Sequence, residues 1–373
     1  MENSSEKNVA IIQHGCSKNL VDTELMIGFL ANAGYSVTLD PDEAKTVVVS
    51  TCSFIHDAEK ESVRSILEMV EAGKRVVVAG CLPQKHKEEL KAAIPEIAAF
   101  LGTCDFDKIV DAIEAQDYYF NVSEEPNYRY PENVERKHIT VGSSAYLKIA
   151  DGCNFSCGYC IIPTLRGKYN SRSMEDILAE AKRLAEMGVS EIILIAQDTT
   201  SWGLDIYSKP SLAKLLCELN KIEELDWIRV LYTYPTYFND ELLEAFKSLD
   251  KVVKYIDMPL QHSDPEILKM MKRPPIDCEE LVLRIRAAVS DVTLRTTLIV
   301  GYPGENDEHF ANLYNFVKKM RFDRLGVFEF SRERGTYAYS LKNQVSASVK
   351  KRRKKQILAL QEKISKEVNE SFI

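Results

Sequence analysis

Hydrophobic and polar positions alternate along the first part of the chain in a way that predicts short strands separated by helices. Apolar runs predict strands over Val9–Gln13, Thr46–Ser50 and Arg75–Ala79. The stretches after them predict helices over Asp22–Ala33, Ala58–Ala72 and Lys85–Ala93. Short apolar strands between helices are typical of a parallel sheet with covering helices. We therefore predict an N-terminal parallel-sheet α/β domain over residues 1–120.

The segment Asp117–His138 interrupts this pattern. It is polar and rich in tyrosine, it contains Pro126 and Pro131, and it has no clean period. Such a composition is typical of a connection rather than a helix or strand. We predict a linker over residues 121–138 and a second domain over residues 139–373.

The alternation of strands and helices resumes in this second domain. Its candidate strands are Ala145–Ile149, Ile192–Ala196, Ile228–Tyr232, Tyr255–Met258, Thr293–Val300 and Arg324–Phe330. Helices are expected between them, for example Ser173–Met187 with Ser173 as N-cap and Asp176 as its reciprocal acid. Six successive strand–helix units predict an α/β fold of the partial (βα)6 TIM-like type.

A long helix is predicted at the end of the chain, over Ser346–Phe372. Ile357, Leu360, Ile364 and Val368 are spaced for one face of it. Its basic run at residues 350–355 would contact phosphate or form a solvated helix face, and charge runs on helices usually have the second role.

Composition and charge narrow the class of protein. The chain has 373 residues, of which 45% are hydrophobic and 28% charged, and its net charge is −8. There is no global basic field to attract nucleic acid, although a local patch is compatible with this charge. The start is polar and no apolar run reaches the length that spans a bilayer, which predicts a cytoplasmic protein without membrane contact. Nine cysteines in that compartment favour metal binding or catalysis over disulfides.

Three of the cysteines follow the three predicted N-terminal strands. They are Cys16, Cys52 and Cys81, and two of them come directly after Gly15 and Gly80. Ligands of open parallel sheets sit beyond the carboxyl ends of the strands, so these thiols are expected to converge in one crevice. Glycine lets the backbone come close to a bulky cofactor. The alternative is three separate buried thiols, a common fate of cysteine.

A second set of cysteines has the spacing C-x3-C-x2-C. Cys153, Cys157 and Cys160 follow the first predicted strand of the barrel, at the carboxyl mouth where barrel active sites lie. Three thiolates on one loop hold three irons of a 4Fe–4S cluster and leave the fourth open for a small molecule. The alternatives are a zinc loop or unrelated thiols. Structural zinc usually has four closed ligands, and no partner knuckle follows here.

With both sets of cysteines placed, the chain resembles the methylthiotransferases, a radical S-adenosylmethionine (SAM) family with two iron–sulfur clusters. The resemblance runs from about Asn8 to the C-terminus. Its auxiliary-cluster segments are Gly15-Cys-Ser-Lys-Asn19, Ser50-Thr-Cys-Ser53 and Ala79-Gly-Cys-Leu-Pro83. The family usually has Asn-Thr-Cys, so Ser50 is a departure, but Cys52 is kept. The resemblance implies that Cys153, Cys157 and Cys160 hold the SAM-binding 4Fe–4S cluster and that Cys16, Cys52 and Cys81 hold the second one.

The resemblance and the barrel pattern together imply the SAM contacts. Tyr159 is expected near the adenine, Gln197 and Asp198 near the methionyl amine, and Gly301 and Gly304 near the adenosyl group. Arg295 is a candidate for the carboxylate, because a guanidinium matches it bidentately. A structural ion pair inside the barrel is the alternative for Arg295. Gln261 and His262 are expected to face the mouth, and His262 has the alternative role of a satisfied core residue.

Several segments resemble the branch of the family (RimO type) that modifies the beta carbon of an aspartate in small-subunit ribosomal protein twelve. They are Gly15–Glu24, Ala196–Thr200, Pro259–His262 and Arg295–Glu305. The resemblance implies an external electron donor, a sulfur source and a second SAM as methyl donor. The other branch, which modifies isopentenylated adenosine in tRNA, is the alternative enzyme. An iron–sulfur carrier without SAM chemistry is the alternative outside that class.

Two further expectations complete the sequence-based picture. Family members end in a small β-barrel domain called TRAM that docks the substrate, and we expect this chain, which stops at Ile373, to lack it and to modify its substrate poorly. Cys104, Cys217 and Cys278 fall outside both sets, and ordinary burial is expected for the last two.

Overall fold

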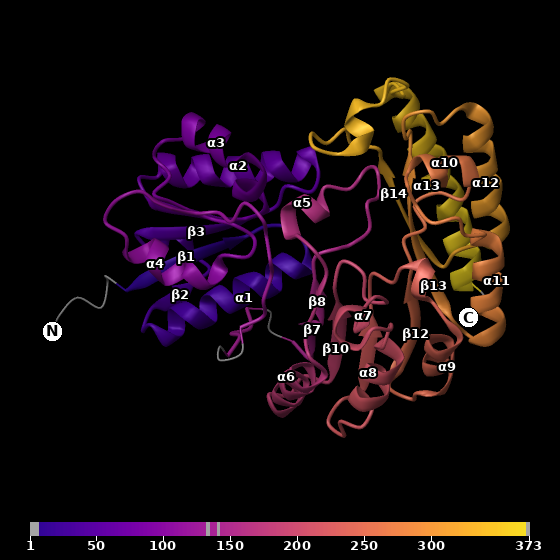
Figure 1. Cartoon of the computed structure of the whole chain (residues 1–373), viewed down its shortest axis with the longest axis horizontal. Coiled ribbons are helices and arrows are strands. Elements are labelled where there is room, and N and C mark those ends of the chain that lie inside the picture. Colours follow the sequence, from indigo (N-terminus) through magenta and orange to yellow (C-terminus); the bar gives the residue numbers. More distant parts are fainter. Residues whose placement is uncertain (1–6, 132–134, 140–141, 371–373) are drawn as a thin grey trace. The chain divides into compact units, whose positions relative to one another are not determined.

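The computed structural model describes residues 7–131, 135–139 and 142–370, and it divides the chain into two compact units (Figure 1). Unit 1 comprises residues 1–141, 151–154 and 161–170, and unit 2 comprises residues 142–150, 155–160 and 171–373. Part of the predicted linker and the predicted end of the last helix at Phe372 lie outside the described residues. Within them, every helix is too short or too polar to cross a bilayer.

Unit 1 is built on a six-stranded sheet in which every pairing is parallel. Its order is β2-β1-β3-β4-β5-β6. The strands are β1 (Asn8–Gln13), β2 (Ser36–Thr38), β3 (Thr46–Thr51), β4 (Arg75–Gly80), β5 (Ala99–Leu101) and β6 (Tyr119–Asn121). Val47, Val49, Val76 and Val78 are fully buried in its core. The predicted parallel-sheet domain is confirmed, and the three cysteine-bearing strands are neighbours in it.

The three helices predicted in unit 1 all begin earlier than predicted, the second by only two residues. The helices of unit 1 are α1 (Ser17–Asn32), α2 (His56–Glu71), α3 (Cys81–Ala93), α4 (Ile109–Glu114) and α5 (Ile162–Arg166). The first turns of α1 carry buried polar residues such as Asn19 and Asp22, so no apolar period marked them. In α3 the backbone at His86 is not helical, which separates the turn after Cys81 from the predicted helix.

The segment predicted as a linker belongs to unit 1 in this division. Tyr128 is buried and its ring lies 5.6 Å from that of Phe106. Arg136 is buried as well and lies 3.2 Å from the carboxylate of Glu24. Its first residues form β6, contrary to the prediction, and beyond Asn121 single side chains rather than a helix or strand face attach it to unit 1.

Unit 2 is built on a second six-stranded parallel sheet, in which each strand pairs with the next one along the chain. The strands are β7 (Ser144–Lys148), β10 (Glu191–Ile195), β11 (Trp227–Val230), β12 (Val252–Asp257), β13 (Thr293–Val300) and β14 (Arg324–Glu329). A buried row crosses it through Leu147, Leu194, Val230, Ile256 and Leu294. This order confirms the predicted barrel-type succession. A separate two-stranded sheet pairs β8 (Ala150–Asp151) with β9 (Asn170–Ser171).

The helices of unit 2 alternate with these strands. They are α6 (Met174–Glu186), α7 (Leu204–Tyr207), α8 (Leu212–Leu219), α9 (Asp240–Ser248), α10 (Pro265–Met270), α11 (Cys278–Ala288), α12 (Asp307–Met320) and α13 (Ala347–Glu370). Ser173 caps α6 as predicted and accepts the N–H of Asp176 at 3.2 Å. The Asp176 carboxylate, predicted to cap in return, instead accepts from Arg172 at 2.7 Å. On α13, Ile357 and Ile364 are buried in line with the predicted apolar face.

Candidate functional site

Cys16, Cys52 and Cys81 lie at the carboxyl ends of the neighbouring strands β1, β3 and β4. Cys16 is the N-cap of α1, Cys52 follows β3, and Cys81 begins α3. The loops meet closely, because a Cβ added to Gly15 would lie 3.0 Å from the Cys52 Cβ and 3.4 Å from its Sγ. The predicted convergence of the three segments at one sheet edge is therefore present, and all three thiols are free.

Main-chain contacts hold this edge together. Gly80 has φ +102° and ψ −141°, a conformation open essentially only to glycine, and a Cβ there would meet the Thr51 carbonyl oxygen at 2.9 Å. The Asn19 amide donates to the same oxygen at 2.8 Å, and the Thr51 hydroxyl donates to the Ala79 carbonyl at 2.7 Å. The ends of β3 and β4 and the first turn of α1 are thereby held together before any cofactor is considered.

A buried arginine lies beside these thiols. Arg166 of α5 places Nη1 2.6 Å from Asp22 and 3.1 Å from Asp151, and Nη2 3.9 Å from the Cys81 Sγ. Burial opposes the charge, but the carboxylates of Asp151 and Asp22 outweigh it and raise the pKa of the guanidinium. Sequence reasoning missed Arg166; the only signal was that Asp151 and Arg166 flank the C-x3-C-x2-C segment.

The surroundings act differently on the three thiols. Loss of water raises the pKa of Cys81 to about 11, although Arg166 opposes the rise. Loss of water also raises the pKa of Cys52. At Cys16 the same effect is outweighed by the charges of Lys18 and Arg166, and the pKa of this thiol is lowered. Cys16 is therefore the thiol that ionises most readily.

The C-x3-C-x2-C segment is an irregular loop. In unit 1, the Cys153 N–H donates to the Gly167 carbonyl at 3.1 Å. In unit 2, the Cys160 N–H donates to the Cys157 carbonyl at 3.0 Å, and the Cys157 Sγ lies 3.8 Å from the Tyr234 hydroxyl. None of the three forms a disulfide, and none is more than partly buried. Three thiols on one loop are the donor set that a 4Fe–4S cluster with one open iron uses, whereas the described residues include no group of three Cys, His, Asp or Glu side chains placed to hold a single metal ion.

Tyr159 is held by a cation and an aromatic layer in unit 2. Arg273 donates to its hydroxyl at 3.1 Å, and the Arg273 guanidinium lies 4.4 Å from the centre of the Tyr234 ring. Phe155 stacks on Tyr234 with a ring distance of 4.0 Å. Burial raises the pKa of Tyr159, which keeps the phenol neutral. No sequence signal pointed to Arg273 or to its contact with Tyr159. The predicted contact of Tyr159 with the adenine of SAM stays a prediction.

Gln197 and Asp198, predicted near the methionyl amine, follow β10, and Gln261, predicted to face the barrel mouth, follows β12. Asp198 is buried and accepts from the Thr200 hydroxyl at 2.5 Å and from Ser201, and burial raises the pKa of its carboxyl. Gln197, beside it, is partly buried. Gln261 has φ +71°, and its main chain pairs with β13 at Thr297 and Ile299 over 2.8 and 2.7 Å. Asp198 thus has local partners already, and its SAM contact stays a prediction.

Arg295 pairs with Asp257 at 2.5 Å, which is the ion pair expected as its alternative role. The Arg295 side chain is 36% exposed, so the guanidinium is still accessible. Burial opposes its charge, and Asp257 outweighs that effect and raises the pKa of Arg295. A role at the SAM carboxylate stays a prediction beside this observed ion pair.

The turn with Gly301 and Gly304 is held by the C-terminal helix. The Gly301 N–H donates to Glu305 at 2.7 Å, and Arg353 of α13 donates to the Glu305 carboxylate at 2.8 Å. A Cβ on Gly301 would lie 2.3 Å from Cγ of Lys350. The basic run is therefore not simply a solvated face: Arg353 is buried, and Lys350 donates to the Phe330 carbonyl at 2.8 Å.

His262 is fully buried next to this turn. Its Nδ1 accepts the Asp264 N–H at 3.0 Å, whereas its Nε2 lies 3.8 Å from Glu305 and has no hydrogen-bond partner among the described residues. Burial lowers the pKa of His262 to about 3, so the ring is neutral near pH 7. It is a core histidine with one nitrogen satisfied.

The remaining cysteines differ from one another. Cys278 is buried in α11, as expected, but Cys217 is exposed on α8, which corrects the expected burial. Cys104 is partly buried, and loss of water followed by the charge of Asp151 raises its pKa to about 12.

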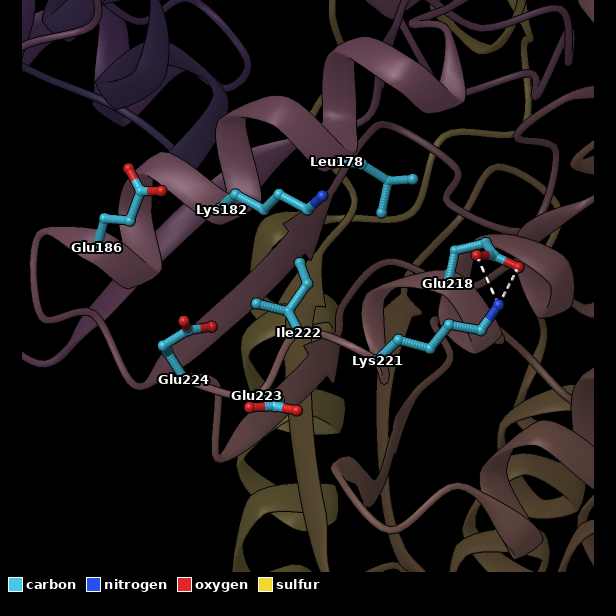
Figure 2. Close-up of a pocket in the computed structure, with 8 residues that line it drawn as sticks. All are labelled: Leu178, Lys182, Glu186, Glu218, Lys221, Ile222, Glu223 and Glu224. Carbon is cyan, nitrogen blue, oxygen red and sulfur yellow. Dashed lines mark hydrogen bonds and ion pairs between the residues drawn. The ribbon is translucent and has the colours of Figure 1, made fainter.

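A pocket of about 410 Å³ lies elsewhere on unit 2. Figure 2 shows its lining of Leu178, Lys182, Glu186, Glu218, Lys221, Ile222, Glu223 and Glu224. These residues belong to α6, α8 and the segment that leads into β11, at the amino ends of β10 and β11. It contains none of the predicted cofactor ligands and is separate from the candidate site.

Two family models match different parts of the chain. The family model described as the radical SAM superfamily matches residues 147–317, and the uncharacterized protein family UPF0004 matches residues 8–102. Proteins named ribosomal protein uS12 methylthiotransferase RimO are similar over nearly the whole chain. One from Prochlorococcus marinus is 48% identical over 98% of this chain and 78% of its own length. One from Gloeobacter violaceus is 47% identical over 98% of this chain and 84% of its own length.

Solved structures share the fold at low sequence identity. The radical SAM methyltransferase TsrM from Kitasatospora setae superimposes with a TM-score of 0.62 and 16% identity, over 86% of this chain and 72% of that one. The cobalamin-dependent SAM radical enzyme OxsB superimposes with a TM-score of 0.56 and 12% identity, over 95% of this chain and 56% of that one.

Proposed function

The chain belongs to the RimO family of ribosomal protein uS12 methylthiotransferases, and from that membership we propose that it attaches a methylthio group to uS12. The proposed position is the beta carbon of an aspartate, an unactivated C–H bond. The cofactors of this family are two 4Fe–4S clusters and SAM. We assign the same cofactors to this chain because its similarity to RimO proteins extends over nearly its whole length.

The observation that carries the proposal is the presence of two sets of three cysteines, none of which forms a disulfide. One set lies at adjacent strand ends of unit 1, and the other lies on the C-x3-C-x2-C loop. An iron–sulfur carrier needs only one of them and no turn for an organic cofactor. When bound, the cluster on the loop would supply the electron that cleaves SAM, and the second cluster would carry the sulfur that is inserted.

The chain's own residues would position these groups. Cys153, Cys157 and Cys160 hold one cluster, and Cys16, Cys52 and Cys81 hold the other. Arg273 fixes the Tyr159 ring through its hydroxyl at 3.1 Å. Arg353 and Glu305 fix the main chain at Gly301, beside the proposed adenosyl position. The buried cluster around Tyr302 and Phe330, against which Tyr159 packs, excludes water from this side.

The proposed contacts with SAM are those predicted from the sequence. Gln197 and Asp198 would bind the amine, Gln261 would contact SAM from the barrel mouth, and Arg295 has an accessible guanidinium for the carboxylate. Residues 1–120 would serve the second cluster and residues 139–373 the SAM cluster.

Further partners follow from the chemistry proposed. The reaction requires an external electron donor and a sulfur source, and a substrate in the ribosome fits a cytoplasmic location.

The test is anaerobic reconstitution followed by mass analysis of both candidate substrates. With SAM, dithionite and sulfide as the sulfur source, we expect one methylthio group on uS12 at a single aspartate and an unmodified tRNA. The variant C16A/C52A/C81A is the matched control, which should still release 5′-deoxyadenosine without forming product. Product on tRNA alone, or product from that triple variant, would overturn the proposal.

A further inference from the structure

The buried guanidinium of Arg166 connects two parts of unit 1 that are distant in sequence. Its Nη1 contacts Asp22 of α1 at 2.6 Å and Asp151 of β8 at 3.1 Å. Its Nη2 contacts the side chain of Asn19 and lies 3.9 Å from the Cys81 Sγ. All of these residues are at most 8% exposed, so the charges interact with little screening by water.

The partners of Arg166 flank the segment that carries the SAM-cluster cysteines. Asp151 comes just before Cys153, and Arg166 follows Cys160 on α5. Asp22 and Asn19 are on α1, the helix that begins directly after Cys16. Arg166 and Asp151 thus connect the two ends of the C-x3-C-x2-C segment to α1, the helix that follows Cys16.

The local charge balance makes this cation important. Two buried carboxylates face one guanidinium, and ligation of iron would add the thiolates of Cys16, Cys52 and Cys81. A buried positive charge near a cluster favours its reduced form, because the added electron is stabilised by the cation. Removal of the guanidinium would take away the positive charge that both carboxylates contact next to the thiols.

We propose that Arg166 is a positioning residue of the second cluster, which holds both flanks of the C-x3-C-x2-C segment on α1 and raises the reduction potential of the cluster bound by Cys16, Cys52 and Cys81. This proposal rests on the proposed function only in requiring that cluster. It assigns a role to the arginine itself, whichever substrate the enzyme modifies.

The experiment measures the second cluster directly in full-length protein. In the background C153A/C157A/C160A, which retains only the second cluster, the reconstituted parent, R166K and R166Q are titrated with reductant and followed by electron paramagnetic resonance. We expect R166Q to shift the potential downward and R166K, which keeps the charge, to restore most of the shift. A merely structural arginine would not produce this dependence on charge.

Arg172 provides the matched control. It is buried as well, and its partners are Asp176 and Glu180 of unit 2, both at 2.7 Å. R172Q therefore removes a buried cation of the same kind and should leave the potential unchanged. An unchanged potential in R166Q, or the same shift in R172Q, overturns the proposal.

Iron content covers the case in which R166Q does not load the cluster. Loading by R166K but not by R166Q supports the role of the charge, whereas equal failure of both variants contradicts it. These readouts involve no substrate. A correct shift in a chain that leaves uS12 unmodified would therefore refute the proposed function and not this inference.

Discussion

The ends of the two sheets are held in different ways. At the edge of the unit 1 sheet, main-chain geometry fixes the strand ends beside Cys52 and Cys81, through the Gly80 conformation and the bonds to the Thr51 carbonyl, and the buried Arg166 adds a charged contact. In unit 2, buried charged side chains hold Tyr159 and the Gly301 turn, through Arg273 on Tyr159 and Arg353 on Glu305. The unit 1 edge should therefore be sensitive to an added Cβ as well as to the loss of a charge, and the unit 2 contacts to the loss of a charge.

The largest effects are expected when all three cysteines of one set are replaced, because the two sets should then lose different activities. In C153A/C157A/C160A, we expect SAM cleavage to fall to background, because the cluster that binds SAM is lost. In C16A/C52A/C81A, SAM cleavage should persist and product should disappear. Each variant should retain about half of the iron. The measurement is 5′-deoxyadenosine release together with iron per chain, and equal SAM cleavage in the two variants would remove the distinction.

The second test removes the charge that holds the Gly301 turn. R353A leaves Glu305 buried without its partner, and breaking a buried pair costs about 3 kcal/mol or more. Trp202 and Trp227 both lie in unit 2, so urea unfolding followed by tryptophan fluorescence reports on this unit. The apparent KM for SAM should rise as well.

Arg352 is the control for that test. It is exposed and lies 3.7 Å from the exposed Asp307, so R352A should change stability by less than about 1 kcal/mol. Similar losses in R352A and R353A would mean that the buried pair is not what holds the turn.

The third test adds one carbon at the unit 1 edge. Gly80→Ala forces alanine into a conformation that costs about 1–3 kcal/mol and brings its Cβ against the Thr51 oxygen. We expect the variant to lose iron of the second cluster and methylthio product while SAM cleavage remains. Gly73 also has a positive φ, but a Cβ added there would have nothing within 4 Å. We therefore expect Gly73→Ala to lower the free energy of unfolding by only about 1 kcal/mol and to retain full iron.

The sequence predicted these two regions to different extents. The strand β13 matches its predicted bounds because its apolar run is long, whereas β5, with only three residues, was missed. The C-x3-C-x2-C motif is visible as a spacing. The other three cysteines became a site only through topology, since parallel strands end at one edge.

The residues that hold the sites were harder to predict. Asp22, Asp151 and Arg166 are far apart in sequence and meet only in the folded unit, so no spacing or period links them. Arg353 lies in a basic run whose neighbours are mostly exposed, and charge pattern alone gave no reason to bury one member. Tertiary pairing of single side chains leaves no periodic signal.

The pH dependence of stability tests the burial of His262 in unit 2. The pKa of His262 is lowered from 6.5 to about 3 in the folded state, so below about pH 6.5 only the unfolded chain takes up this proton. Stability should therefore fall with decreasing pH by up to about 1.4 kcal/mol per pH unit from this group. In H262N, whose side-chain oxygen can still accept from Asp264, that part of the slope should vanish. Fluorescence-detected unfolding between about pH 5 and 7 measures it, and parallel slopes would refute the assignment.

The smallest effects are expected at cysteines outside both sites, which tests whether position rather than thiol chemistry defines a ligand. Cys217 is exposed on α8, so C217S should change stability by less than about 0.5 kcal/mol and leave iron per chain unchanged. Cys278 is buried, and C278A should cost about 1 kcal/mol through the lost packing, again with full iron. Neither thiol lies at a strand end of unit 1 or on the C-x3-C-x2-C loop. Loss of a whole cluster in either variant would show that one of the two sets of three is incorrectly assigned.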